Sequence, residues 1–299
     1  MADDASMNDR RIGATPVSIP WSTQFDVASA ITGRTYRIFV FQPPTPAPPA
    51  GYPAMTVLDG NMTFPIAAAM AATYAWSMCP TMVVGVGYPS DNPAEMMLSR
   101  FRDLTPETSA EGIPQRPGLP ALSAEHVGGA DGFHRFLTEE LRPLIAARHA
   151  VDAERQALFG YSLGGLFTLH ALFTQPAAWR SYAAASPSIW WDDAALLSRE
   201  GGFRHAVEQG EASPRVLISV GAREQEPPLR TPPGMSADEI AALIEEGRMV
   251  DNAWELGSRL ERLRGGEGYR AVFHAFDEED HLTGLAASIG RALDFATRE

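Results

Sequence analysis

The stretch Ala157-Leu158-Phe159-Gly160-Tyr161-Ser162-Leu163-Gly164-Gly165-Leu166-Phe167-Thr168-Leu169 decides the fold. An apolar run typical of a strand leads into a Gly-x-Ser-x-Gly pattern, and an apolar run typical of a helix leads out of it. A strand, a sharp turn and a helix in this order expose a serine at the carboxyl end of a sheet. Glycines are needed two residues to either side, because side chains would collide where the strand and the helix cross. A nucleotide-binding turn would instead need a Gly-x-Gly-x-x-Gly spacing or a phosphate-binding lysine, and neither is present. The stretch therefore predicts Ser162 as a nucleophile.

Segments typical of strands and of helices alternate on both sides of this turn. Short apolar strands are expected over residues 54–58, 81–86, 156–159, 182–185, 216–220 and 271–276. Helices are expected over residues 66–77, 131–148 and 163–173. This alternation predicts an α/β fold with a mainly parallel central sheet and helices on both faces. The residues that do chemistry are expected at the carboxyl ends of the strands.

The N-terminal part of the chain follows a different pattern. Residues 23–29 and 35–41 alternate polar and apolar side chains on either side of Thr32-Gly33-Arg34, which predicts an antiparallel hairpin at a sheet edge. We expect residues 1–20 to form a loose arm and residues 21–299 to form a single domain. Residues 107–130 are rich in Gly, Pro and Ser, and this composition predicts a long loop near the active site.

The composition of the 299 residues excludes several classes of protein. With 24 Lys and Arg against 37 Asp and Glu, the formal charge is −13 and no basic run occurs, so nucleic-acid binding is not expected. The single cysteine, Cys79, cannot form an intrachain disulfide or a four-cysteine zinc site. Residues 61–90 are uncharged, but Pro65 and Pro80 interrupt them, so no membrane span is expected. Because the polar N-terminus lacks a secretory signal pattern, we expect a cytoplasmic protein, and we expect it to need no metal or cofactor.

A serine hydroxyl becomes a nucleophile when a base takes its proton and an acid orients that base. In this architecture the acid and then the histidine follow the serine in the chain. His281 lies in a polar loop just past the last predicted strand and is the predicted base, whereas His274 alternates within that strand and is predicted to be structural. Glu224 follows the strand at 216–220 and is the predicted acid, with Asp251 as the alternative.

Further motifs resemble those of the esterase branch of the α/β-hydrolases, and within it the ferric-siderophore esterases that cleave enterobactin-type trilactones. Besides the serine turn, the matching pieces are Leu58-Asp59-Gly60, Val84-Gly85-Val86-Gly87-Tyr88-Pro89, Arg102-Asp103-Leu104-Thr105-Pro106, Gly129-Ala130-Asp131-Gly132-Phe133, Ser186-Pro187-Ser188-Ile189-Trp190-Trp191 and His281. They spread over about residues 20–299. The resemblance implies an α/β-hydrolase fold and a serine esterase that uses Ser162 and His281.

The resemblance also bears on the oxyanion hole and the acid. Two backbone donors are expected, the N–H of Leu163 and one from the loop after Leu58, and the resemblance implies that the second is the N–H of Asn61. The acid of the family matches Glu224, although some members rely on a Ser–His dyad without a well-placed acid. Residues 225–248 look like an insertion after the acid, so the acid remains open between Glu224, Asp251 and none.

The expected substrate is a small-molecule ester, and the main hypothesis is an iron-bound catecholate siderophore. A ferric tris-catecholate is an anion that a chain of charge −13 repels on average, so a local group of arginines is expected to attract it. The candidates for that group are Arg100, Arg102, Arg116 and Arg223. Further substrate contacts are expected from Tyr88, Tyr161, Trp190 and Trp191, with the tryptophans stacking on aryl rings. The alternatives are a broad carboxylesterase or thioesterase of small acyl esters, and a non-catalytic binding protein.

Overall fold

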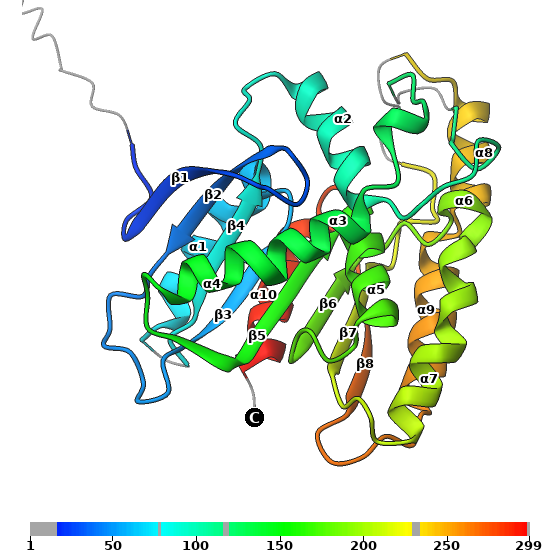
Figure 1. Cartoon of the computed structure of the whole chain (residues 1–299). Helices are drawn as coiled ribbons and strands as arrows, with labels where there is room; N and C mark the ends of the chain where they lie inside the picture. Colours follow the sequence, from blue (N-terminus) through cyan, green and yellow to red (C-terminus); the bar gives the residue numbers. More distant parts are fainter. Residues whose placement is uncertain (1–16, 77–78, 116–119, 229–233, 298–299) are drawn as a thin grey trace, which may run out of the picture.

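Eight strands form one continuous sheet in the part of the chain that the computed structural model describes, which is residues 17–76, 79–115, 120–228 and 234–297. Their spatial order is β1-β2-β4-β3-β5-β6-β7-β8 (Figure 1). The strands are β1(Ser22–Ala28), β2(Thr35–Phe41), β3(Tyr52–Val57), β4(Met82–Gly87), β5(Val151–Tyr161), β6(Ser181–Ala185), β7(Arg215–Gly221) and β8(Arg270–Phe276). β1 and β2 pair antiparallel, as do β2 and β4, and all other pairs are parallel. The predicted edge hairpin and the mainly parallel sheet of an α/β-hydrolase fold are confirmed.

Helices cover both faces of the sheet. The α-helices are α1(Gly60–Tyr74), α2(Pro93–Leu104), α3(Ala130–Arg135), α4(Arg142–Ala146), α5(Leu163–Thr174), α6(Trp191–Ala194), α7(Glu200–Glu208), α8(Ala237–Gly247), α9(Met249–Glu261) and α10(Gly284–Thr297). Short 3₁₀ turns are η1(Ala124–His126) and η3(Ala195–Arg199), and η2(Phe136–Leu141) is a π-helical segment between α3 and α4. In Figure 1, α4 and α5 lie on one face, whereas α1 and α10 lie behind the sheet. No helix of the described residues is long and apolar enough to cross a membrane.

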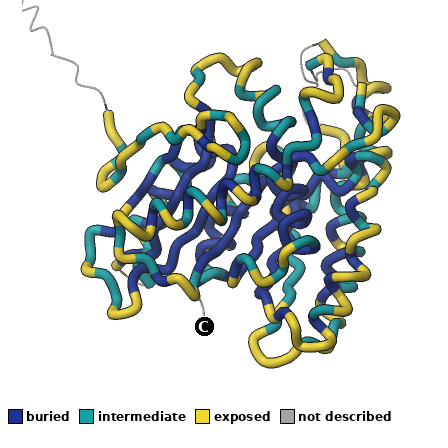
Figure 2. Tube along the Cα trace, viewed as in Figure 1, coloured by how far each residue is buried: buried dark blue, intermediate teal, exposed yellow. Residues whose placement is uncertain are grey.

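The core consists of two layers of side chains, one on each face of the sheet. The strands run through the buried interior, and the outer surfaces of the helices are exposed (Figure 2). α5 is buried from Leu163 to Phe173 without interruption, because it lies directly against β5 and β6. A helix buried on all sides is expected to be mostly apolar, and α5 is. Its buried polar residues Thr168 and His170 are hydrogen-bonded, to the carbonyl of Gly164 and to the carboxylate of Asp131.

The strand order reverses between β3 and β5, and this reversal positions the candidate site. The chain passes from β3 to β4 on one side, and β5 then pairs with the other side of β3. The carboxyl ends of two neighbouring strands therefore lead into α1 and α5 in different directions, which leaves a crevice where ligands bind in open α/β sheets. Asn61 follows β3 and Ser162 follows β5, so both residues lie at this point.

Several element boundaries differ from the sequence-based expectation. α1 begins at Gly60, six residues before the expected helix, and Pro65 lies inside it. Pro65 had suggested a later start, but α1 continues through it, and it lies in the second turn of the helix. The segment expected as one helix over 131–148 is α3, η2 and α4, and the π-helical segment lies just before Pro143, which has no N–H to donate. Most of the expected arm at 1–20, and part of the loop at 107–130, lie outside the described residues.

Candidate active site

Ser162 occupies a sharp turn between β5 and α5. Its backbone has φ 60° and ψ −116°, a conformation that residues with a side chain rarely adopt. A Cβ atom on Gly160 would collide with the carbonyl of Gly164, and one on Gly165 would lie 2.7 Å from the carbonyl oxygen of Ala185. A Cβ atom on Gly164 would make only ordinary contacts, at 3.5 Å or more. The turn therefore requires Gly160 and Gly165, and the expected steric need for Gly164, the second glycine of the sequence pattern, is wrong.

A chain of hydrogen bonds links Ser162 to a histidine and a carboxylate. Nε2 of His281 lies 3.1 Å from Oγ of Ser162, and Nδ1 of His281 lies 2.7 Å from Oε2 of Glu224. When Nδ1 donates to the carboxylate, Nε2 is left unprotonated and can accept the serine proton. The three side chains follow β5, β7 and β8, so the parallel register brings them to one end of the sheet.

The Glu224 carboxylate is held on its other side by two donors. Its Oε1 accepts a hydrogen bond of 2.5 Å from Oγ of Ser186 and one of 2.8 Å from the N–H of Gly221. The side chain of Glu224 is completely buried, whereas the imidazole of His281 is 42% exposed. A buried carboxylate with three polar partners has a fixed orientation, and it can stabilise a charged imidazole that substrate can still approach.

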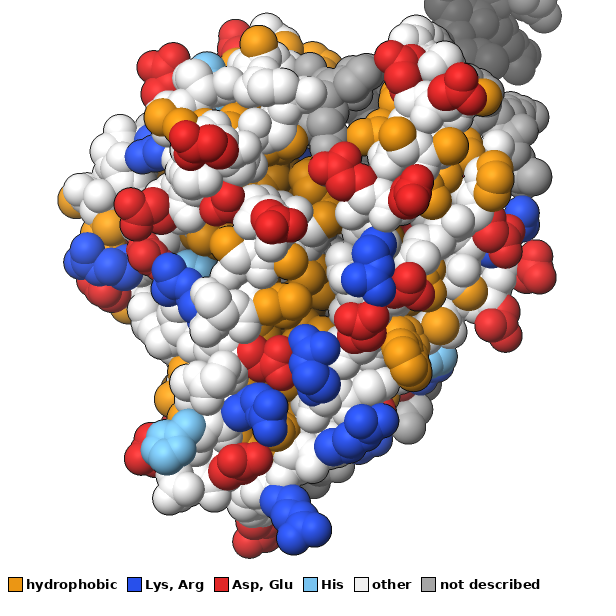
Figure 3. Space-filling view, turned by 90° about the vertical axis from the view of Figure 1, so that its right-hand side faces the viewer, with side chains coloured by type: hydrophobic (Ala, Val, Ile, Leu, Met, Phe, Trp, Pro, Cys, Tyr) orange, Lys and Arg blue, Asp and Glu red, His pale blue; other side chains and the backbone are white. Residues whose placement is uncertain are grey.

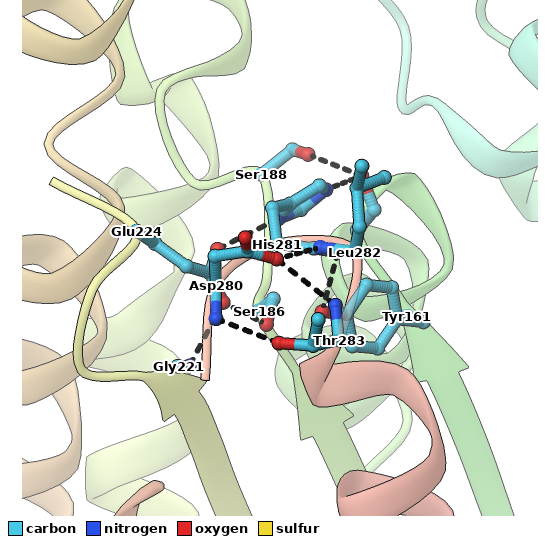
Figure 4. A network of polar contacts seen from close by, with 10 residues as sticks. Tyr161, Ser186, Ser188, Gly221, Glu224, Asp280, His281, Leu282 and Thr283 are labelled. Atoms are coloured by element: carbon cyan, nitrogen blue, oxygen red, sulfur yellow. Dashed lines mark hydrogen bonds and ion pairs between the residues drawn. The ribbon is translucent and has the colours of Figure 1, made fainter. Parts of the chain in front are cut away.

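The loop that carries His281 is fixed by its own turn and by Tyr161 (Figure 4). Oδ1 of Asp280 accepts hydrogen bonds from the N–H groups of Leu282 and Thr283, at 2.8 and 3.0 Å. The hydroxyl of Tyr161 donates to the carbonyl of His281 at 2.9 Å, and its ring lies 5.3 Å from the imidazole ring. Burial raises the pKa of Tyr161 far above its usual value, so the hydroxyl stays protonated and able to donate.

Two backbone N–H groups lie where an oxyanion hole is expected, at the beginnings of α1 and α5. Asn61 is the second residue of α1 and Leu163 is the first residue of α5, and helix N-termini present N–H groups without intrahelical acceptors. The Asn61 side chain is tied to the backbone of Tyr88, accepting from its N–H at 2.8 Å and donating to its carbonyl at 3.0 Å. Gly87 leaves the space that Asn61 fills. The loop after β3 is thus attached firmly to the end of β4.

The arginines expected to attract an anionic substrate are engaged within the protein. Arg100 forms a two-pronged ion pair with Asp59, with both N–O distances at 2.9 Å. Arg223 pairs with Glu226 at 2.9 Å and with Glu278 at 3.6 Å. The guanidinium of Arg102 donates to the carbonyl of Val127. Arg116 lies outside the described residues.

Three of the four aromatic residues expected to contact substrate are buried. Tyr88 lies in the core, Tyr161 turns its hydroxyl toward the His281 loop, and the indole N–H of Trp191 donates to Oγ1 of Thr108 at 2.9 Å. The expectation that both tryptophans offer a stacking surface is therefore corrected for Trp191, whose ring is buried in the core with its centroid 5.7 Å from that of Phe101. Trp190 is partly exposed and lines a groove.

The groove next to Trp190 has a volume of about 610 Å³ and acidic walls. One side is formed by residues 111–115 of the predicted long loop, and the other by the α8–α9 region. Its charged lining residues are Glu111, Asp192, Asp193, Glu246 and Arg248. Figure 3 shows a hollow with apolar side chains at its floor and several carboxylates around it on this side of the molecule. Residues 111–115 of this loop thus line a surface groove.

The remaining candidates lie away from the hydrogen-bonded chain. Asp251, the alternative acid, is half exposed and lies 3.6 Å from the guanidinium of Arg248. His274 packs edge-on against Phe276 within β8, in the structural position expected for it. Sequence reasoning did not assign a role to Ser186 or to Ser188, whose Oγ lies 3.5 Å from that of Ser162. Both serines belong to the Ser-Pro-Ser-Ile-Trp-Trp motif, and this motif was the feature of the sequence that could have pointed to them.

Comparison with known proteins places this geometry in context. The model of the family described as "Putative esterase" matches residues 29–255. The chain is 36% identical to ferri-bacillibactin esterase BesA of Bacillus subtilis, over 96% of this chain and 94% of that protein. It is 32% identical to the siderophore triacetylfusarinine C esterase of Aspergillus fumigatus, over 96% of each chain. The crystal structure of the BES protein from Bacillus cereus superimposes with a TM-score of 0.80 at 30% identity, covering 96% of this chain and all of that one.

Proposed function

This chain is an ester-hydrolysing enzyme that belongs to the esterase family, and we propose that it cleaves the ester bonds of an iron-binding siderophore with Ser162, His281 and Glu224. The observation that carries the catalytic assignment is the unbroken chain of hydrogen bonds from Glu224 through His281 to a serine at a strained turn. The substrate assignment is supported by the two relatives, whose names specify siderophore esters.

The proposed reaction proceeds through an acyl-enzyme. Oγ of Ser162 attacks the ester carbonyl while Nε2 of His281 takes the hydroxyl proton, and the carbonyl oxygen becomes an oxyanion. The N–H groups of Asn61 and Leu163 donate to that oxyanion. The tetrahedral intermediate collapses as His281 returns the proton to the leaving alcohol oxygen, which leaves an ester on Ser162. Water, deprotonated by His281, then releases the carboxylic acid and restores the serine. Glu224 stabilises the charged imidazole in both halves of the reaction.

The experiment that tests this function compares substrates side by side. Purified protein is incubated with ferri-bacillibactin, ferric enterobactin and ferric triacetylfusarinine C, and with p-nitrophenyl acetate, and the products are followed by mass spectrometry. Linearised siderophores that have gained one water per cleaved ester are expected, and S162A should form none. Intact siderophores together with rapid turnover of p-nitrophenyl acetate would contradict the siderophore assignment and leave the esterase. A cytoplasmic site of action is part of the proposal, and cell fractionation tests it.

A specific feature favours small acyl esters as the second candidate substrate class. Met62 and Leu282 are exposed at 59% and 85%, and they directly follow Asn61 and His281 in the chain. Apolar side chains beside an oxyanion donor and a base provide a surface for a short acyl or alkyl group. Arg100 and Arg223 are both paired with carboxylates. Their positive charges are therefore neutralised within the protein, and an uncharged ester can bind near them as well as an anionic one.

A further inference from the structure

A buried ion pair lies at the beginning of α1, two residues before the proposed oxyanion donor. The Asp59 carboxylate accepts from Nε and Nη2 of Arg100, each at 2.9 Å, and the two side chains are only 6% and 14% exposed. Arg100 comes from α2, the helix that follows β4, so the pair joins the beginning of α1 to α2 at the carboxyl end of the sheet. Planar two-pronged contacts of this kind fix both groups in orientation as well as in distance.

Asp59 occupies the N-cap position of α1, yet its side chain does not cap the helix. An aspartate at an N-cap ordinarily accepts from the N–H of the second or third helical residue. In α1 the second residue is Asn61, and the third is Met62, whose N–H binds the carbonyl oxygen of Asp59 at 2.9 Å. The carboxylate points instead to Arg100. If Asp59 capped α1 in the ordinary way, it would compete with the oxyanion for the N–H of Asn61.

The same carboxylate lies close to the other proposed donor. A Cβ atom on Gly164, the residue after Leu163, would be 3.5 Å from Oδ2 of Asp59. An unpaired negative charge at this position would repel the negative charge that forms on the substrate oxygen, and such repulsion is strong where water is excluded. The guanidinium of Arg100, in direct contact with the Asp59 carboxylate, neutralises this negative charge.

We infer that Arg100 is a positioning residue that keeps the oxyanion hole open, by holding the Asp59 carboxylate away from the N–H of Asn61 and neutralising it. This inference rests on the proposed function, since it concerns the same reaction. Arg100 acts through Asp59 and does not contact the substrate. The position of the Asn61 side chain does not depend on Arg100, because its two hydrogen bonds to Tyr88 fix it separately.

The inference predicts an asymmetry between the two partners of the pair. R100M frees a carboxylate beside the oxyanion hole, so kcat for p-nitrophenyl acetate should fall by about 10²-fold, the order expected for the loss of one oxyanion donor, with KM little changed. D59G removes the carboxylate, and glycine suits the positive φ of 54°, so kcat should stay within about 10-fold of the wild type. The double variant R100M/D59G should be faster than R100M by about 10-fold or more.

The matched control is R37M, which breaks a two-pronged Arg–Asp pair in the N-terminal hairpin, where Arg37 binds Asp26 at 2.9 and 3.2 Å. Circular dichroism confirms that each variant is folded, and R100K, which keeps the charge, should retain more kcat than R100M. A double variant no faster than R100M, or equal losses of kcat in R100M and D59G, would overturn the inference. If R100M does not fold, the same comparison is made between R100Q and R100Q/D59G, because glutamine removes the positive charge and still offers a hydrogen-bond donor to Asp59. Failure of the proposed function is distinguishable, because it would be seen in the wild-type protein, as siderophores left intact or, if the catalytic assignment itself failed, as no turnover of p-nitrophenyl acetate and no reaction of Ser162 with a fluorophosphonate.

Discussion

Ser162 and His281 are 119 positions apart in the sequence, and Nε2 of the histidine lies 3.1 Å from the serine oxygen. The parallel register from β5 through β8 produces this proximity, because each strand delivers its following loop to the same end of the sheet. The histidine needs no movement to accept the serine proton, since the distance is already that of a hydrogen bond.

Replacing the nucleophile gives the simplest prediction. S162A should lower turnover of p-nitrophenyl acetate by up to about 10⁶-fold, because removal of the attacking oxygen leaves only binding and the oxyanion donors. Stopped or continuous absorbance assays measure the rate, and fluorophosphonate labelling of the wild type but not of S162A identifies the reactive side chain. The neighbouring hydroxyl of Ser188 serves as the internal comparison, since retained labelling in S162A would point to that serine instead.

The identity of the acid is decided by comparing two carboxylates. E224Q should lower kcat by about 10³-fold or more, since an amide cannot stabilise the imidazolium and can select the wrong tautomer. D251A should leave kcat almost unchanged, because Asp251 lies beside Arg248 on the surface. Steady-state kinetics on both variants give the result. Equal and small effects would mean that the enzyme works as a Ser–His dyad.

The hydroxyl of Tyr161 is predicted to hold the base in place. Y161F loses the hydrogen bond to the carbonyl of His281, so kcat should fall by about 10-fold while fluorophosphonate labelling still goes to completion. Y269F is the matched control, since the hydroxyl of Tyr269 also donates to a backbone carbonyl, that of Leu260 at 2.8 Å, far from the site. If Y161F and Y269F had the same kcat, the bond from Tyr161 would have no catalytic importance.

Glycine at the serine turn is predicted to be irreplaceable. In G165A the new Cβ would lie 2.7 Å from the carbonyl oxygen of Ala185 and 2.8 Å from Cα of Pro187, so the turn must shift. We expect a loss of about 1–3 kcal/mol in the free energy of unfolding, measured by urea denaturation. G201A in α7 is the control, because nothing lies near its Cβ, and it should gain about 0.5–1 kcal/mol. The two glycine-to-alanine substitutions should thus change the free energy of unfolding in opposite directions.

Asp103 should make stability depend on pH. Burial raises the pKa of this carboxyl to about 6, although Arg34 acts in the opposite direction. Because the folded pKa exceeds the unfolded value of about 3.9, its contribution to stability is complete below that value and is lost as pH rises through 6. The difference in unfolding free energy between wild type and D103N should therefore shift against the wild type by up to about 3 kcal/mol between pH 4 and 7. Urea denaturation of both proteins at several pH values measures this difference. If the difference did not change with pH, the pKa of the buried Asp103 carboxyl would not be raised.

The sequence predicts the parallel sheet, the hairpin and the serine turn because each depends on local pattern. Alternation of side chains defines β1 and β2, and the steric need for Gly160 acts within a few residues, because a Cβ atom there would meet the carbonyl of Gly164. The need for Gly165 comes from Ala185 and Pro187, which follow a different strand. The loop at His281 was also predictable, since a polar loop after the last strand must reach the same sheet end as the serine.

Other features depend on contacts between distant residues, and the sequence leaves them open. The position of Glu224 just after its strand favours it over Asp251 but leaves both open in the sequence, because the hydrogen bonds that single out Glu224 come from Ser186 and His281, which arrive from other strands. Arg100 looks like a free cation in the sequence, and only the fold places Asp59 against it. For the same reason Trp190 and Trp191 are adjacent in sequence, yet Trp191 is in the core and Trp190 lines the groove.

The placement of β8 has a consequence for how this enzyme can fail. β8 forms the outer edge of the sheet, pairs only with β7, and is partly exposed along most of its length. Edge segments with little cover open by local fluctuation at a lower energetic cost than the centre of a domain. His281, the proposed base, lies in the loop that follows this strand, whereas Ser162, the proposed nucleophile, follows β5 in the middle of the sheet. We therefore expect this edge to loosen before the centre of the sheet does, so that activity would be lost under milder conditions than those that unfold the whole domain.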